Sequence, residues 1–242
     1  MYMSNISSRL VEQDLKALAK PTKAVILSRF FKTGKGEYAE GDKFLGVVVP
    51  DIRLIAKKYV GLSLSGVEKL IHSPWHEIRL TGLIILTYQY PKSSPALHKK
   101  IYKLYIKSLK YINNWDLVDL TADRIVGQYL RDKDKEVLFT LSQSPNLWKR
   151  RVSIMATFCY IKQGDPTLTY KLALNLLHDP HDLIHKAVGW MLRETGKRCS
   201  KQGLVSFLNK HSKDMPRTML RYAIEHFPKQ ERMGYLTKPR TK

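Results

Sequence analysis

Apolar residues recur along this chain at the three- and four-residue spacing of amphipathic helices, beginning within the first ten positions. The first run consists of Ile6, Leu10, Leu15 and Leu18. A second run begins at Pro21, which suits the first turn of a helix because its φ is fixed and no N–H is needed there. This run continues through Ala24, Ile26, Leu27 and Phe30. The pattern therefore predicts two helices before residue 31.

The helical pattern is interrupted over residues 33–44, where three glycines in TGKGEYAEGDKF predict a loop. The β-branched segment that follows, residues 46–49, would also suit a strand. However, it leads directly into Pro50 and an amphipathic run, which consists of Ile52, Ile55, Ala56 and Tyr59. We therefore interpret it as a short apolar lead-in to a helix that has Pro50 near its first turn.

A repeat becomes visible from residue 73 onward. Three segments (73–90, 144–161 and 179–196) each open with Ser-Pro or Asp-Pro and continue into an apolar helical pattern. Each has a basic residue or His five positions after the proline, and then a small residue where helices can approach closely. These positions are Arg79, Arg150 and His185, followed by Gly82, Ser153 and Gly189. Looser copies occupy 115–130 and 215–227, and the intervals of roughly 30–40 residues are typical of solenoids built from helix pairs.

Plainer helical patterns lie between these copies, at 96–112, 134–144, 167–179 and 203–212. Together they predict an all-α fold in which antiparallel helix pairs stack into a curved solenoid, an α-α superhelix, with equivalent helices lining one concave face. No domain boundary is evident, so we expect a single domain over residues 1–242. The polar and basic tail at 229–242 is expected to fray.

The charge of the chain is strongly unbalanced. Lys and Arg number 42 against 21 Asp and Glu, a formal net charge of +21, while apolar residues make up 43% and suffice for a sizeable core. Solubility alone is one explanation, but it needs a net charge of only about 2–8 in a small domain. A more basic domain attracts polyanions, so the charge favours nucleic-acid phosphate as the partner.

The sequence lacks the common motifs of nucleotide and metal chemistry. It contains no Gly-x-x-x-x-Gly-Lys, Gly-x-Gly-x-x-Gly, His-Glu-x-x-His or Gly-x-Ser-x-Gly. Cys159 and Cys199 form no Cys-x-x-Cys pair and suit a reducing compartment. No run of about 18 apolar residues exists, and residues 1–15 lack the apolar core of a signal peptide. We therefore expect a cytoplasmic protein without metal, cofactor or membrane contact.

The most informative cluster of polar and aromatic residues is NNWDLVD at 113–119. On a helix, Trp115 and Asp119 are four positions apart and share a face, while Leu117, Leu120 and Ile125 can serve the buried side. A carboxylate beside an indole is unusual on a basic surface, because the carboxylate opposes phosphate binding. Spacing alone leaves open the alternative of a packing tryptophan with a carboxylate near a helix N-terminus.

A second cluster lies on a later helix, where Lys186, Trp190 and Arg193 stand at i, i+4 and i+7 and form one stripe. The indole can stack on a sugar or base while the two cations hold the flanking phosphates. A core tryptophan with snorkelling neighbours is the alternative.

A third cluster is the segment WKRR at 148–151. Its consecutive cations point in several directions around a helix, so not all of them can face one groove. Arg151 lies three positions after Trp148 and near the same face. For each of these cations a solvated basic turn is as reasonable as a phosphate contact.

Four segments in order, FLGVVVPDIR (44–53), WDLVD (115–119), NLWKRR (146–151) and KAVGWMLRE (186–194), resemble the DNA alkylation repair family of AlkD-like DNA glycosylases. The resemblance covers most of the chain, and the four segments together are specific although each alone is weak. It implies HEAT-like repeats and a glycosylase domain that spans residues 1–242.

The resemblance also implies roles for individual residues. The tryptophan and aspartate of the W-D-x-V-D segment are catalytic in the family, and Trp115 and Asp119 match them. Trp190 matches a tryptophan that lines the same site, and Arg151 matches an arginine that contacts DNA. Asn114 departs from the family, because many members have an aromatic residue at that position. Further DNA contacts are expected from Lys186, Arg193, Trp148 and Arg150.

The implied reaction is the release of cationic alkylpurines, such as 3-methyladenine and 7-methylguanine, from double-stranded DNA. A cationic base leaves without a general acid, Asp119 would stabilise the oxocarbenium and position water, and the two tryptophans would face the deoxyribose. The family works on an open face, without rotating the base into a pocket. Two alternatives are a non-catalytic repeat protein that binds damaged or branched DNA and a helical-repeat protein scaffold. A monomer is expected.

Overall fold

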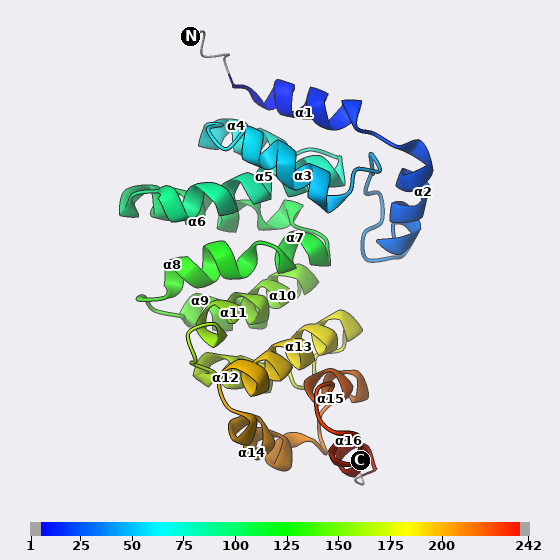
Figure 1. The fold of residues 1–242 in the computed structure, drawn as a ribbon, viewed down its shortest axis with the longest axis vertical. Coiled ribbons are helices and arrows are strands. Elements are labelled where there is room, and N and C mark those ends of the chain that lie inside the picture. The colour runs from blue at the N-terminus through cyan, green and yellow to red at the C-terminus, as the bar shows by residue number, and fades with distance from the viewer. Residues whose placement is uncertain (1–5, 238–242) are drawn as a thin grey trace. The chain divides into compact units, whose positions relative to one another are not determined.

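The structure is a computed structural model that describes residues 6–237 (Figure 1). The described chain is helical almost throughout, which confirms the predicted all-α fold, and within it one isolated parallel β-bridge joins Lys43 and Trp75. The chain divides into two compact units, which we call the first unit (residues 1–129) and the second unit (residues 130–242). The expected single domain and concave face stay predictions.

The first unit contains the helices α1 (Ser8–Ala17), α2 (Pro21–Phe30), α3 (Val49–Lys58), α4 (Leu64–Ile71), α5 (His76–Gln89), α6 (Pro95–Lys107) and α7 (Trp115–Asp119). It also contains the 3-10 helices η1 (Tyr90–Lys92) and η2 (Ser108–Tyr111) and the π-helix η3 (Asp123–Gly127). Helix α8 (Gln128–Leu130) leads into the second unit. That unit contains α9 (Glu136–Ser142), α10 (Leu147–Ala156), α11 (Phe158–Ile161), α12 (Thr167–Asn175), α13 (Asp182–Arg198), α14 (Lys201–His211), α15 (Arg217–Ala223) and α16 (Lys229–Leu236).

Helix α5 forms the centre of the first unit. Every residue from His76 to Thr87 is buried, and the helix packs against α1, α3, α4 and α7. A Cβ added at Gly82 would lie 3.0 Å from Cβ of Leu70 and 3.1 Å from Cγ1 of Ile71. This close contact between α5 and α4 confirms the role predicted for the small residue of the repeat.

The apolar segment before α3 is a lead-in to that helix, as predicted, with Pro50 in the first turn. Gly46 has a φ of 85°, and a Cβ there would lie 2.2 Å from the carbonyl oxygen of Lys20, so only glycine fits. The buried Glu77 carboxylate accepts hydrogen bonds from the backbone N–H groups of Leu45, Gly46 and Val47 at 2.8–3.3 Å. These amides bind a side chain in place of a neighbouring strand, which explains why a β-branched segment forms no sheet.

Helix α13 dominates the second unit, where it packs against α10, α12, α14 and α15 (Figure 1). A Cβ added at Gly189 would lie 2.4 Å from the carbonyl oxygen of Met219 on α15. Ser153, the small residue of the preceding repeat, is fully buried on α10. The small residues of the repeat are therefore positions where neighbouring helices approach closely.

The basic position of the repeat has the same structural role in all three copies. Each side chain binds the backbone carbonyl six positions earlier, directly before the proline. The pairs are Arg79 Nη1 with Ser73 O (3.1 Å), Arg150 Nη1 with Ser144 O (3.0 Å) and His185 Nε2 with Asp179 O (2.5 Å). We call this arrangement the repeat corner. It satisfies a carbonyl at the start of the turn and so explains why the sequence repeats a basic residue there.

Residues 115–130 do not form the continuous helix that the looser repeat copy suggested. Helix α7 ends at Asp119, and the chain resumes as the π-helix η3. The Thr121 hydroxyl donates to the carbonyl oxygen of Leu117 at 2.5 Å, while the Thr121 N–H binds the carbonyl oxygen of Val118 at 3.1 Å. A threonine side chain that takes the carbonyl of the fourth residue before it competes with the regular helical ladder. The break leaves α7 only five residues long.

The tail predicted to fray is instead helical over much of its length, as α16. Its last turn is attached to the rest of the second unit, because Arg217 Nη1 donates to the carbonyl oxygen of Leu236 at 2.6 Å and Tyr235 bonds to Asn209 at 3.0 Å. Polar composition suggested fraying, but these tertiary bonds order the helix. Residues 238–242 of the tail lie outside the described residues.

Candidate functional site

Helix α7 holds the two residues predicted to be catalytic, Trp115 and Asp119. Asn114 precedes it as the N-cap, and its side-chain oxygen accepts the Trp115 N–H at 2.8 Å. The Asn114 side chain is fully buried, and its Nδ2 has no hydrogen-bond partner among the described residues. The residue that departs from the family thus acts as a cap in this chain.

Trp115 is half-buried in a cluster of aromatic rings from α2 and the loop that follows it. Phe31 stacks on its indole with 5.2 Å between ring centroids and 25° between planes, and Phe30 meets it edge-on at 5.9 Å. Phe31 stacks in turn on Phe44 at 5.2 Å. The predicted helix α2 has no buried residue, and Phe30 is 60% exposed. The Trp115 ring is therefore held on one face while an exposed phenylalanine stands at its edge.

Asp119 lies one turn after Trp115 on α7, is half-buried, and shares the face of the indole as predicted. The buried Tyr105 hydroxyl, which bonds Thr121 at 3.0 Å, has a raised pKa because of burial and the nearby charges of Asp123 and Asp119. The structure thus places Asp119 on the same short helix as Trp115 and near Tyr105, and its catalytic role stays a prediction.

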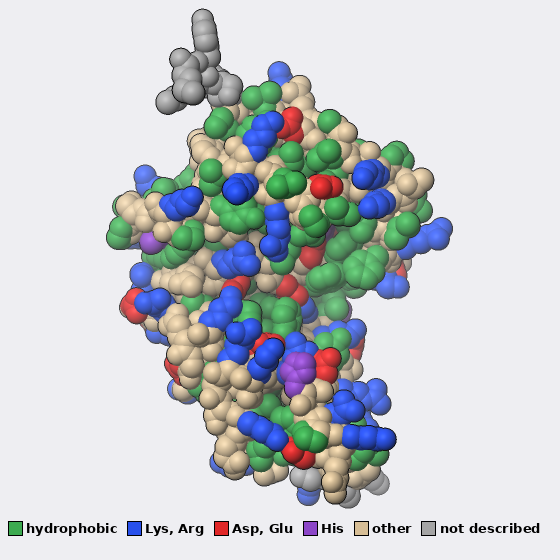
Figure 2. All heavy atoms as spheres, viewed as in Figure 1, with side chains coloured by type: hydrophobic (Ala, Val, Ile, Leu, Met, Phe, Trp, Pro, Cys, Tyr) green, Lys and Arg blue, Asp and Glu red, His purple; other side chains and the backbone are tan. Residues whose placement is uncertain are grey.

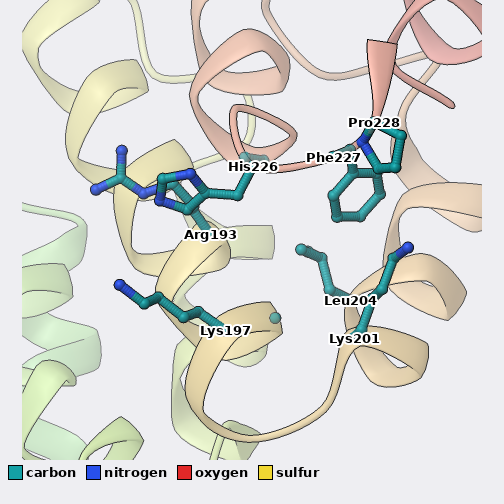
Figure 3. Close-up of a pocket in the computed structure, with 9 residues that line it drawn as sticks. Arg193, Lys197, Lys201, Leu204, His226, Phe227 and Pro228 are labelled. Atoms are coloured by element: carbon teal, nitrogen blue, oxygen red, sulfur yellow. The ribbon is translucent and has the colours of Figure 1, made fainter. Parts of the chain in front are cut away.

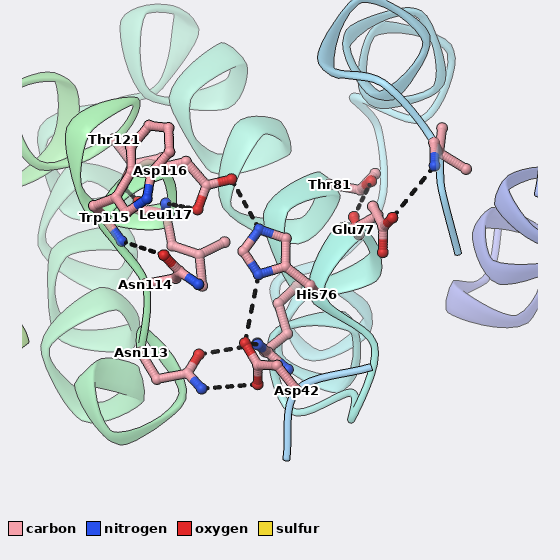
Figure 4. A network of polar contacts seen from close by, with 12 residues as sticks. Asp42, His76, Glu77, Thr81, Asn113, Asn114, Trp115, Asp116, Leu117 and Thr121 are labelled. Carbon is pink, nitrogen blue, oxygen red and sulfur yellow. Dashed lines mark hydrogen bonds and ion pairs between the residues drawn. The ribbon is translucent and has the colours of Figure 1, made fainter. Parts of the chain in front are cut away.

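A buried charged network lies behind α7 (Figure 4). His76 of α5 bonds through Nε2 to Asp116 Oδ2 at 2.8 Å, and its Nδ1 lies 3.6 Å from Asp42 Oδ2. Burial opposes charge on the imidazole, but the two carboxylates outweigh it and raise the pKa of His76 to about 9. His76 is therefore an imidazolium at neutral pH, flanked by two carboxylates.

The same network continues to the repeat corner of the first unit. Arg79 Nη2 donates to Asp42 at 2.7 Å and to Asn113 Oδ1 at 2.9 Å, and Asn113 Nδ2 donates to Asp42 Oδ1 at 2.8 Å. Burial would raise the pKa of Asp42, but bonds from His76, Arg79 and Asn113 hold it below its usual value. The loop before α3, helix α5 and the start of α7 are thus joined by charge-assisted hydrogen bonds.

We did not predict this network from the sequence, although a signal was present. The repeat identified Arg79, but only as a repeated basic position. His76 and Glu77 are also polar, and they are buried among the apolar residues of α5. Polar residues that interrupt a continuous apolar helix point to buried bonding partners. The partners themselves, Asp42 and Asp116, are 34 and 40 residues away along the chain.

In the second unit, α13 brings Lys186, Trp190 and Arg193 onto one stripe, as predicted. Trp190 is half-buried, with Phe158 at 6.4 Å between ring centroids. Lys186 Nζ lies 2.8 Å from Asp182, and Arg193 pairs with Glu225 and, at 3.4 Å, with Glu194. Both cations of the stripe therefore have carboxylate partners that a phosphate would have to replace.

The segment 148–151 lies deeper than a solvated basic turn. Trp148 and Arg151 are each 5% exposed, and Arg151 Nη1 donates to the carbonyl oxygen of Leu183. Arg150 occupies its repeat corner and pairs with Asp179 at 2.6 Å. Their assignment to DNA contact stays a prediction, and in the structure these side chains make contacts within the protein.

A basic pocket of about 490 Å³ opens where α13 ends (Figure 3). Its polar lining consists of Arg193, Lys197, Lys201 and His226, and its apolar lining includes Leu204 and Phe227. Lys201 Nζ pairs with Glu231 at 3.0 Å and lies 5.2 Å from the Phe227 ring centroid. Figure 2 shows Lys and Arg side chains on the visible surface of each unit, interspersed with hydrophobic ones.

Neither a membrane-spanning helix nor a metal-binding cluster occurs in the part of the chain that the structure describes. No helix between residues 6 and 237 is long and apolar enough to cross a membrane. No three His, Cys, Asp or Glu side chains in that range gather in a way that could hold a metal ion.

These elements define an all-α protein of solenoid-like fold in which the candidate site residues lie on α7, α10 and α13. The family model for DNA alkylation repair enzymes matches residues 11–227, and the chain belongs to that family. Its fold is similar to a solved structure described as a predicted DNA alkylation repair enzyme from Enterococcus faecalis, with a TM-score of 0.67. That match covers 87% of this chain and 97% of the other at 16% sequence identity. No curated protein matches the chain. Family membership supports an enzyme with a role in DNA repair.

Proposed function

We propose that this protein is a DNA glycosylase that hydrolyses the N-glycosidic bond of cationic alkylpurines, such as 3-methyladenine and 7-methylguanine, in duplex DNA. The observation that supports this most is the arrangement on α7, where the half-buried Asp119 follows the stacked Trp115 by one turn on the same face. Such a pair offers a carboxylate and a π surface to a sugar on which positive charge develops.

The proposed reaction needs no general acid. The alkylated base is already a cation, so it departs as a neutral base with the electron pair of the glycosidic bond, and positive charge passes to the deoxyribose. Asp119 stabilises that charge and orients a water molecule, whose oxygen bonds to the sugar carbon and whose proton is lost to the carboxylate or solvent. The Trp115 ring adds a contact with the cationic sugar of roughly 0.5–2 kcal/mol.

In this proposal the second unit binds the DNA. Trp190 is a second aromatic surface for the deoxyribose, as the family resemblance implies. DNA phosphates replace Asp182 as the partner of Lys186 and Glu225 as a partner of Arg193, because exposed ion pairs are weak and exchange readily. Arg150, Arg151 and Trp148 are proposed to support this surface from within α10.

The test is incubation of the purified protein with methylated duplex DNA, followed by identification of the released bases by mass spectrometry. The wild type should release 3-methyladenine and 7-methylguanine, and Asp119→Asn should release neither while still binding a duplex with an abasic-site analogue. Wild-type excision by Asp119→Asn would overturn the catalytic assignment. DNA binding without base release by the wild type would instead support the non-catalytic DNA-binding alternative.

A weak and salt-independent affinity for DNA would contradict both DNA hypotheses and favour a protein scaffold. A protein that makes about 6–10 phosphate contacts should lose about a thousandfold in affinity between roughly 50 and 200 mM salt.

A further inference from the structure

Helix α7 has too few residues to hold its own conformation. It contains five residues, whereas isolated helices shorter than about 12–15 residues are marginal in water. Contacts with neighbouring elements must therefore determine where Trp115 and Asp119 point. Two routes by which such contacts reach α7 pass through one residue, His76.

The first route is a direct hydrogen bond. His76 Nε2 bonds to Asp116 Oδ2 at 2.8 Å (Figure 4). Asp116 is the residue that directly follows Trp115 in the first turn of α7. Asp116 also accepts the N–H of Leu117 through Oδ1 at 2.9 Å. The imidazole therefore fixes the first turn of α7 from the side opposite to solvent.

The second route is a stack of aromatic rings. The His76 ring stacks on Phe44 with 4.6 Å between centroids and 20° between planes, and it lies 5.0 Å from Phe31. Phe31 is the ring that stacks on Trp115. A change in the position of the imidazole would thus be passed to the indole through Phe31 as well as through the backbone of α7.

We propose that His76 is a positioning residue that holds Trp115 and Asp119 in the geometry needed for base release, by clamping α7 between Asp116 and the aromatic stack. It touches neither DNA nor the reacting atoms. The role in catalysis rests on the function proposed above, whereas the clamping of α7 does not.

The charge of the imidazole is part of the clamp. Asp116 from α7 and Asp42 from the loop before α3 face it with negative charge, and Arg79 from its own helix opposes it. A protonated ring donates to Asp116 through Nε2 and also forms an ion pair with Asp42, 3.6 Å from Nδ1, whereas a neutral ring loses the charge attraction to both carboxylates. Loss of the proton should therefore loosen the clamp.

The test compares His76→Gln with the matched variant His98→Gln. His98 lies in the same unit, is half-buried, stacks on Tyr90 at 4.1 Å and bonds to the Tyr90 carbonyl oxygen at 2.8 Å, but belongs to α6. His76→Gln should lower the single-turnover rate of base release by about 100-fold, since a small misplacement of catalytic groups has that cost. Its affinity for an abasic-analogue duplex should stay unchanged, and His98→Gln should match the wild type in both.

A structural readout makes the proposal independent of activity. The protein labelled with fluorotryptophan gives one ¹⁹F signal for each of its four tryptophans, and Trp115→Phe identifies the signal of Trp115. That signal should shift in His76→Gln and not in His98→Gln. In the wild type it should also move as the pH rises through about 9, where His76 loses its proton, and in His76→Gln it should not.

Asp116→Asn keeps the shape of the side chain and serves as a second variant if His76→Gln does not fold. It should shift the same ¹⁹F signal and lower the same rate. Trp115 signals that are identical in His76→Gln, Asp116→Asn and the wild type would overturn the proposal. Absence of base release by the wild type, with a shifted Trp115 signal in His76→Gln, would refute the glycosylase function and leave the clamp intact.

Discussion

The two tryptophans proposed to face DNA have different surroundings. Trp115 belongs to a five-residue helix fixed by stacked rings and by ion pairs that are buried on both partners. Trp190 belongs to a 17-residue helix, and Lys186 and Arg193 on that helix pair with Asp182 and Glu225, which are each 53% exposed. Arg193 has a second partner in the buried Glu194, at 3.4 Å. Buried pairs impose geometry, whereas exposed pairs contribute little to stability and exchange with ions. The first unit thus suits precise placement of groups, and the second suits reversible attraction of phosphate.

The largest difference between the units should be seen in the rate of base release when one carboxylate is neutralised on the helix of each tryptophan. Asp119→Asn should slow base release by at least about 10²–10³-fold, enough to leave no detectable release of either base, because it removes charge that stabilises the transition state. Asp182→Asn, which removes a carboxylate that pairs with Lys186, should leave the rate of the bound complex unchanged. Single-turnover kinetics with excess enzyme measure both. Equal losses of rate in the two variants would contradict the proposed division of roles between the two units.

The next largest effect is expected in the free energy of unfolding, and it tests the buried ion pairs of the first unit. The pKa of His76 is raised from 6.5 to about 9 in the folded protein, so folding binds its proton more tightly. The resulting stabilisation of about 3 kcal/mol is complete below the unfolded pKa and is lost as the pH rises through the folded pKa. Urea unfolding at neutral pH and above pH 9 should show this loss in the wild type and in His98→Gln. His76→Gln should lack it, and an identical pH profile would be evidence against the buried imidazolium.

A smaller effect is expected from the exposed pairs of the second unit. Replacing both Lys186 and Arg193 with Gln should lower the slope of log affinity against log salt by about 2, since each phosphate contact contributes about 0.9. The rate of base release at saturating enzyme should stay the same. Filter binding over a range of salt concentrations gives the slope, and an unaltered slope would remove these residues from the proposed interface.

The smallest effect should come from the basic pocket at the end of α13. Lys197→Gln should reduce the same slope by about 1 if a DNA phosphate enters the pocket. Lys210→Gln serves as the control, since Lys210 is an exposed lysine near the end of α14 that is not part of the pocket lining. Matching slopes for the two variants would limit the DNA interface to the stripe on α13.

The fold could be predicted because its signals are local. The 3.6-residue periodicity, the proline at the start of α3 and the small residues of the repeat each depend on neighbours in sequence or in the adjacent repeat. The same local patterns predicted too long a helix at 115–130, because the side chain of Thr121 determines where α7 ends. It also suggested a frayed tail, because the bonds that order α16 come from α14 and α15.

The candidate site could be predicted only in part. The spacing of Trp115 and Asp119 on one helical face follows from the sequence, and so does the stripe on α13. The support behind Trp115 does not, because Asp42, His76 and Asp116 are brought together only by folding of the first unit. Burial is also hidden from the sequence, and for this reason Arg151 resembles a surface cation although it is 5% exposed.

The repeat corner changes how many of the basic residues of such a protein should be counted as available to DNA. The formal net charge of +21 includes Arg79 and Arg150, whose guanidinium groups bind backbone carbonyls and the carboxylates of Asp42 and Asp179. These cations belong to the scaffold, and because Asp42 and Asp179 are also counted in the net charge, the two ion pairs cancel within it. The net charge of +21 is therefore unaffected, but fewer of the 42 Lys and Arg side chains are available to DNA than the composition suggests. A basic residue kept at this position through successive repeats would look like a nucleic-acid-binding signature in an alignment, although selection there would act on folding.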